Sequence, residues 1–105
     1  MSDFIPVAKL QALPTEGKLC LEIEGRFVVI VRLGSSVYCL DDVCTHDGGT
    51  LGDGQLIDGC LECPRHGARF DVCSGEAVCM PATEPTQNHE VKLEDDTIWV
   101  KLADG

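Results

Sequence analysis

The chain has 105 residues, of which 44% are hydrophobic, so it is long enough for one compact domain and too short for a two-lobed enzyme. Eight Lys and Arg residues stand against 18 Asp and Glu residues, which gives a formal net charge of −10. Nucleic acids and anionic membrane surfaces are bound through clustered basic side chains. We therefore expect protein partners only, with no nucleic acid and no membrane.

Neither a membrane anchor nor a secretory signal is predicted. The longest unbroken apolar run covers residues 27–31, far below the ~20 residues that span a bilayer. Residues 1–4 have neither the basic nor the apolar region of a signal peptide. We interpret the chain as cytoplasmic, where its seven cysteines stay reduced and metal binding explains some of them.

The first 40 residues predict a meander of antiparallel strands. Apolar and polar residues alternate over 19–23, which is the period of a half-buried strand. Glycine-containing turns separate this run from a β-branched segment at 26–32, and that segment from a strand at 37–40. A closing hairpin of strands 91–93 and 98–101 is predicted around the polar turn 94–97. No helix of ~10 or more residues has a clean 3.6-residue period, so the fold class is all-β.

The middle of the chain is rich in loops and contains five of the seven cysteines. Segments 55–57 and 60–62 flank Asp58-Gly59, which is a typical turn of a tight β-hairpin. A further strand is predicted within 67–72. We interpret the chain as a single domain over 1–105, with base strands in about 1–40 and 86–105 and an inserted subdomain at about 41–85.

Two short motifs in this insert carry metal-binding chemistry. Cys44-Thr45-His46 and Cys63-Pro64-Arg65-His66 each supply one thiolate and one imidazole, and 16 residues separate them. If the hairpin between them folds back, the two motifs lie side by side. Two cysteines and two histidines can then converge on one site.

The pattern favours an iron–sulfur cluster over a single zinc ion. Zinc sites of two cysteines and two histidines usually pair like residues within a motif, whereas each motif here mixes them. The mixed pattern suits a [2Fe-2S] cluster in which one iron takes both cysteines and the other takes both histidines. Two thiolates leave the oxidised cluster near zero charge, against −2 for four thiolates, so an electron is added more easily.

These residues resemble those of Rieske iron–sulfur proteins. The C-x-H and C-x-x-H motifs, Gly48, Pro64, Gly67 and the later Pro81 are similar to the three cluster-covering loops of that family. The resemblance extends over nearly the whole chain. It implies a small β-sandwich or barrel base that carries an inserted, loop-rich cluster-binding subdomain.

The resemblance also implies the ligands. Cys44 and Cys63 would bind one iron, and His46 and His66 would bind the other iron of one [2Fe-2S] cluster per chain. Pro81 would help to shield the cluster. No catalytic residue is expected.

Four positions depart from the high-potential members of the family. Those proteins have a disulfide where this chain has Gly49 and Arg65, and a serine and a tyrosine where it has Ala68 and Phe70. The missing hydroxyls would otherwise donate hydrogen bonds to cluster sulfurs. We therefore expect a potential toward the low end of the Rieske range, roughly −150 mV.

The resemblance implies a one-electron carrier that is not itself an enzyme. The chain looks like the ferredoxin that passes electrons from an NAD(P)H-dependent reductase to a terminal oxygenase in aromatic hydrocarbon catabolism. After the ligands are assigned only His89 remains, too few histidines for a mononuclear iron site. We expect a monomer that docks transiently through its His46 and His66 end. The alternatives are an accessory subunit of a reductase, such as NADH-dependent nitrite reductase, and a zinc-stabilised interaction module.

The remaining polar and reactive residues have plainer interpretations. Five cysteines are expected to be buried as small apolar side chains: Cys20, Cys39, Cys60, Cys73 and Cys79. His89 is interpreted as a solvated loop residue. The acidic pair Asp41-Asp42 is interpreted as a solvated turn that could also contribute to docking.

Two arginines lie beside the second motif in this acidic chain. Local salt bridges of Arg65 and Arg69 with Glu62 or Asp71 are one interpretation. The other is that Arg65 contacts the redox partner.

Overall fold

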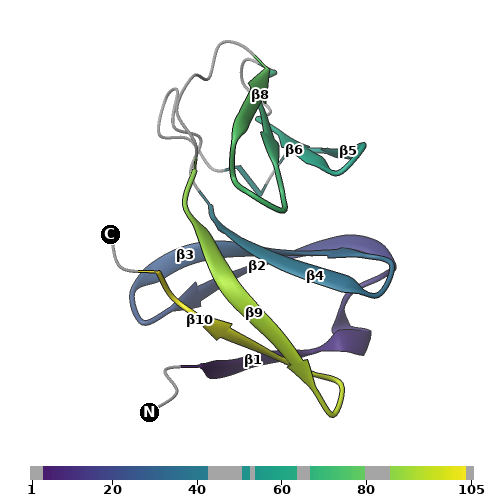
Figure 1. Ribbon diagram of the computed structural model, residues 1–105, viewed down its shortest axis with the longest axis vertical. Coiled ribbons are helices and arrows are strands. Elements are labelled where there is room, and N and C mark those ends of the chain that lie inside the picture. The colour runs from purple at the N-terminus through teal and green to yellow at the C-terminus, as the bar shows by residue number, and fades with distance from the viewer. Residues whose placement is uncertain (1–3, 43–50, 53, 64–66, 80–85, 104–105) are drawn as a thin grey trace.

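The described residues form two antiparallel sheets, and the predicted all-β fold class is confirmed (Figure 1). The computed structural model describes residues 4–42, 51–52, 54–63, 67–79 and 86–103. The elements within these residues are β1 (Ile5–Lys9), a 3-10 helix (Leu10–Ala12), β2 (Glu16–Ile23), β3 (Arg26–Leu33), β4 (Ser36–Asp41), β5 (Leu56–Ile57), β6 (Cys60–Glu62), β7 (Arg69–Asp71), β8 (Ala77–Cys79), β9 (Asn88–Glu94) and β10 (Thr97–Lys101). In the described part of the chain, no helix has the length and apolar character needed to cross a membrane.

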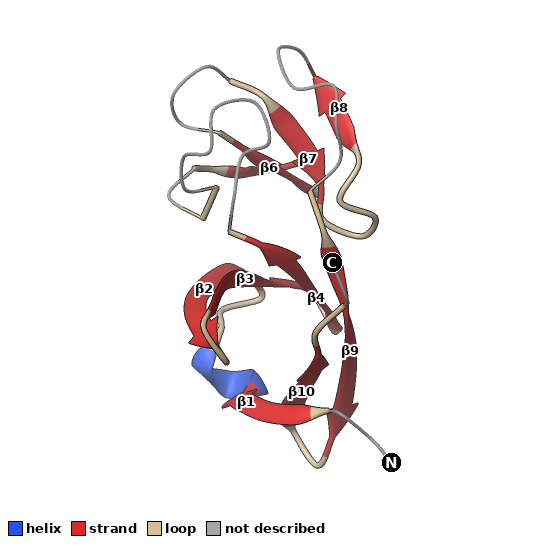
Figure 2. Ribbon diagram, turned by 90° about the vertical axis from the view of Figure 1, so that its left-hand side faces the viewer, coloured by secondary structure: helices blue, strands red, loops and turns tan. Residues whose placement is uncertain are grey.

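The larger sheet has the strand order β1-β10-β9-β4-β3-β2 and curls on itself (Figure 2). The predicted meander is β2-β3-β4, and the predicted closing hairpin is β9-β10, so both are confirmed. Strand β1 was not predicted. It is an edge strand of five residues that contains Pro6, which has no N–H to donate, and its pairing with β10 is irregular between Pro6 and Ala8.

The smaller sheet, β5-β6-β7-β8, stands above one end of the larger sheet in Figure 1. Its β5-β6 hairpin turns at Asp58 and Gly59, whose φ angles of 49° and 77° are both positive, as a type I′ turn requires. The predicted hairpin is therefore confirmed. Strand β8 was not predicted, because its three residues have no turn signal such as Asp58-Gly59 beside them and its register with β7 is irregular.

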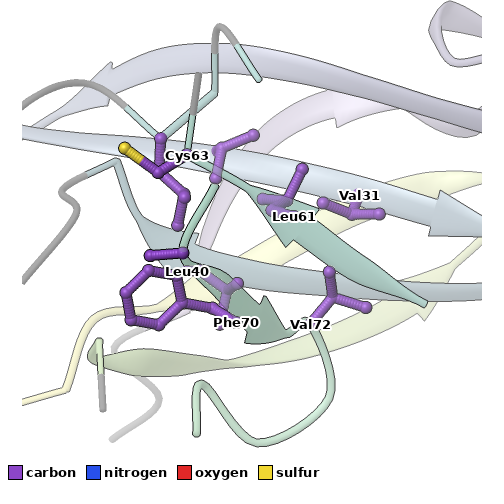
Figure 3. Close-up of a cluster of buried hydrophobic side chains, with 9 residues drawn as sticks. Val31, Leu40, Leu61, Cys63, Phe70 and Val72 are labelled. Atoms are coloured by element: carbon purple, nitrogen blue, oxygen red, sulfur yellow. The ribbon is translucent and has the colours of Figure 1, made fainter. Parts of the chain in front are cut away.

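Strand β3 is buried on both faces and joins two hydrophobic cores. Val28 and Ile30 belong to the core inside the curled sheet, whereas Val29 and Val31 belong to a second core between the two sheets. The second core also contains residues of the smaller sheet and its flanking segments: Leu51, Leu61, Cys63, Ala68, Phe70 and Val72 (Figure 3). Side chains alternate along a strand, so β3 serves both cores at once.

A glycine contact brings the turn after β7 against the start of β9. Gly75 has a φ of 81°, and a side chain there would collide with the backbone carbonyl of Thr86. The Thr86 N–H donates a hydrogen bond of 2.8 Å to the Gly75 carbonyl. Both the backbone conformation and the lack of space therefore require glycine at this position.

His89 is buried, and its interpretation as a solvated loop residue was wrong. It lies in β9, where Nδ1 accepts a hydrogen bond of 2.9 Å from the Ala103 N–H and Nε2 lies 2.7 Å from Asp41 Oδ1. Arg26 forms a salt bridge of 3.0 Å with Asp41 and donates to the Ala103 carbonyl at 2.6 Å. Arg26, Asp41, His89 and Ala103 thus form a closed ring of hydrogen bonds. Because Nδ1 is an acceptor, the proton that binds Asp41 is on Nε2.

This ring predicts that replacing His89 destabilises the base. In His89→Phe the Ala103 N–H loses its acceptor and Asp41 Oδ1 keeps only its hydrogen bond from Arg26, at a cost of about 2 kcal/mol. For a domain of this size that lowers the midpoint of thermal unfolding by roughly 10 °C. Glu90→Gln, at an exposed neighbour in the same strand, is the control and should leave the midpoint nearly unchanged. Equal midpoints for the two variants would show that the ring contributes nothing.

Candidate metal centre

Cys63 is positioned by the hairpin of β6 and β7. Beyond the last strand pair, Glu62 with Arg69, the Cys63 N–H donates to the Ala68 carbonyl at 2.6 Å. The Gly67 N–H then donates back to the Cys63 carbonyl at 3.1 Å, and its φ of 76° makes this turn possible. Cys63 is thus held on its backbone N–H and its carbonyl at the point where the hairpin reaches its tip.

The Cys63 thiol is buried, with 1% of the residue exposed, and forms no disulfide. It belongs to the core between the two sheets, together with Leu40, Leu61 and Phe70 (Figure 3). A buried, unpaired thiol at the edge of a loop is the soft donor that iron prefers, and apolar surroundings keep water away from it. This residue therefore fits the predicted cluster.

The other three predicted ligands, Cys44, His46 and His66, lie outside the described residues. Gly48, Gly49, Pro64, Arg65 and Pro81 lie outside them as well. Among the residues that are described, no group of three or more His, Cys, Asp or Glu side chains is arranged to hold a metal ion. The convergence of the four ligands thus stays a prediction.

The structure does describe both ends of the segment that carries Cys44 and His46. Asp42 follows β4, is buried, and donates its own N–H to the Phe27 carbonyl at 3.0 Å. Its carboxylate accepts a hydrogen bond from the N–H of Gly52, on the other side of the segment. The interpretation of Asp42 as part of a solvated turn was therefore wrong, because its buried carboxylate binds the backbone N–H of Gly52, ten residues later.

Ala68 and Phe70, two of the positions that depart from the high-potential proteins, are both fully buried. The Phe70 ring packs in the core between the sheets and holds the hairpin against β3 and β4. Next to it, Arg69 Nε lies 3.0 Å from Glu62 Oε2, so the expected local salt bridge of Arg69 is confirmed. That pair is partly exposed and contributes little to stability.

The other described cysteines differ in their surroundings. Cys39 is buried as expected, and burial, followed by the charge of Asp41, raises the pKa of its thiol to about 12. Burial, followed by Asp71, also raises the pKa of Cys60. Cys20 and Cys73 are exposed, against expectation, and the side chain of Cys79 lies outside the described part. Cys39 is neutral at ordinary pH and serves as a small apolar residue.

Comparison with known proteins is consistent with this geometry. Residues 3–93 match the Rieske [2Fe-2S] domain family. The ferredoxin component of the naphthalene 1,2-dioxygenase system of Pseudomonas aeruginosa is 32% identical over 100 residues, which are 95% of this chain and 96% of that protein.

Solved structures of ferredoxins have the same fold. The ferredoxin of carbazole 1,9a-dioxygenase from Nocardioides aromaticivorans superposes with a TM-score of 0.88 and 31% identity, over 94% of this chain and 97% of that one. A chain in a complex of reduced oxygenase and oxidised ferredoxin of carbazole 1,9a-dioxygenase gives a TM-score of 0.89 and 27% identity, over 94% of this chain and 93% of that one. The family match over most of the sequence, the shared fold and the buried thiol at the hairpin tip lead to one conclusion: the chain belongs to the Rieske [2Fe-2S] domain family.

Proposed function

We propose that the chain is the ferredoxin of a ring-hydroxylating oxygenase system, where it carries single electrons from an NAD(P)H-dependent reductase to a terminal oxygenase. The observation that carries this proposal is the likeness over nearly its full length to ferredoxin components of dioxygenase systems. A similar ferredoxin has been solved in complex with its oxygenase. Proteins of this kind transfer electrons and leave the oxidation of the substrate to the oxygenase.

The proposed ligands are Cys44 and Cys63 on one iron, and His46 and His66 on the other. The cluster they hold supplies a one-electron redox couple. The described residues act on its surroundings. The hairpin fixes the backbone of Cys63 through the Cys63 and Gly67 hydrogen bonds, and the core around the thiol excludes water.

The organisation of the chain follows from the two sheets. We place all 105 residues in one Rieske domain, with the base in about 1–40 and 86–105 and the cluster-binding subdomain in about 41–85. Strands β1 to β4, β9 and β10 form the larger sheet, whereas β5 to β8 form the smaller one, which supports this division. We propose a cytoplasmic monomer that docks through its His46 and His66 end.

The first prediction concerns the cluster and its ligands. Purified protein should contain iron and sulfide in the ratio of a [2Fe-2S] cluster, and reduction with dithionite should produce the EPR signal of mixed Cys and His ligation. Cys63→Ser should abolish or strongly alter this signal. Cys73→Ser, at an exposed cysteine, is the matched control and should leave it unchanged. Stoichiometric zinc and no EPR signal would instead identify an interaction module.

The second prediction separates a free carrier from a fixed subunit. Expressed alone, the protein with its cluster bound should elute as a monomer. It should accept one electron from a reductase supplied with NADH and pass that electron to a terminal oxygenase. If the net charge of −10 guides docking to basic partner surfaces, stopped-flow rates should fall as ionic strength rises. A protein that is reduced only while bound permanently to a large reductase would be an accessory subunit.

The third prediction tests whether the missing hydroxyls at positions 68 and 70 cause the low potential that we expect for this cluster. Ala68→Ser and Phe70→Tyr each add a hydroxyl where high-potential relatives have one. A hydrogen bond that stabilises the reduced cluster by about 1.4 kcal/mol raises a one-electron potential by about 59 mV. Protein-film voltammetry should therefore give a higher potential for each variant. Ala68→Gly adds no donor and is the control. If neither hydroxyl variant changes the reduction potential, the missing hydroxyls at positions 68 and 70 do not set it.

A further inference from the structure

The segment that carries Cys44 and His46 is closed at its base by one side chain. Asp42 precedes this segment, Gly52 follows it, and the Gly52 N–H donates a hydrogen bond to Asp42 Oδ1. Asp42 is 9% exposed, so an ionised carboxylate is held largely away from water. Burying a carboxylate is unfavourable unless it accepts hydrogen bonds, and a backbone N–H donor to a charged acceptor is a strong one.

Gly52 is held from a second side. Lys18, in β2, donates from Nζ to the Gly52 carbonyl, so a cation binds the carbonyl and an anion binds the N–H of the same residue. A side chain at Gly52 would collide with the sulfur of Cys20 and would crowd the Asp42 carboxylate. The residue before it, Leu51, is fully buried in the core between the sheets.

We propose that Asp42 and Lys18 are positioning residues for the cluster, because together they fix the Gly52 backbone and thereby set the ends of the segment that supplies Cys44 and His46. The inference rests on the proposed ligand set. The Asp42 hydrogen bond joins residues ten apart in the chain, on either side of the segment that carries the two proposed ligands. In general, holding the two ends of a loop at fixed positions lowers the entropic cost of placing ligands within it, so loss of this hydrogen bond should weaken retention of the cluster.

Three variants test the proposal in the loaded protein. Asp42→Ala removes the acceptor, Asp42→Asn removes the charge but keeps an acceptor oxygen, and Lys18→Met releases the Gly52 carbonyl. Val100→Ala, in the core inside the curled sheet, is a control that lowers stability without touching the segment. The readouts are cluster content per chain, the EPR g values, and the rate of cluster loss to an iron chelator.

We expect Asp42→Ala to lose its cluster about tenfold faster than the wild type and to have altered g values. Asp42→Asn, which keeps an acceptor oxygen, should have a rate of cluster loss and g values close to those of the wild type. Lys18→Met should also lose its cluster faster, whereas Val100→Ala should unfold at a lower temperature and keep the wild-type rate. Wild-type rates and g values in both Asp42→Ala and Lys18→Met would overturn the proposal. If Asp42→Ala does not fold, Lys18→Met alone decides.

The same experiment distinguishes this inference from the proposed function. A wild-type protein that binds no [2Fe-2S] cluster would contradict the proposed function. A wild-type protein that binds the cluster, with all variants alike, would contradict only the positioning roles of Asp42 and Lys18.

Discussion

The burial of β3 on both faces is the constraint on which the rest of the structure depends. An isolated curled sheet of this size would expose one face of β3 to water, whereas here Val29 and Val31 are covered by the smaller sheet and its flanking segments. These side chains stay buried only while the smaller sheet and its flanking segments remain packed on the larger sheet. Apolar packing therefore joins the two sheets, and the Cys63 thiol lies at the boundary that this packing creates.

Local signals in the sequence predict most of the fold. The alternation over 19–23, the β-branched run of β3 and the Asp58-Gly59 turn act within a few residues, and each corresponds to the observed element. Strands β1 and β8 are short, and their pairing partners lie far away or across an irregular register, so no local period indicates them. His89 has polar neighbours in sequence, but it is buried and binds Asp41 and Ala103, which are distant from it in the chain.

The candidate site shows the same division between local and distant causes. Cys63 was predicted as a cluster ligand from the spacing of cysteine and histidine in two short motifs, and this role stays a prediction. Asp42 was missed, since an acidic pair at the end of a strand has the same sequence pattern whether it is solvated or bound to Gly52. What distinguishes the two cases is the hydrogen bond from the N–H of Gly52, ten residues later, which the acidic pair itself does not predict.

The ring of Arg26, Asp41, His89 and Ala103 has a consequence for the order of folding. Its last member follows β10, and β10 also provides the partner of β1, with Ile5 opposite Val100. During synthesis the hairpin of Cys63 can form early, because its contacts are local, whereas the larger sheet is complete only after β9 and β10 have been made. The insert thus emerges from the ribosome before its support is complete. The core inside the curled sheet, which contains Ile98 and Val100, is therefore complete only after the insert has been synthesised.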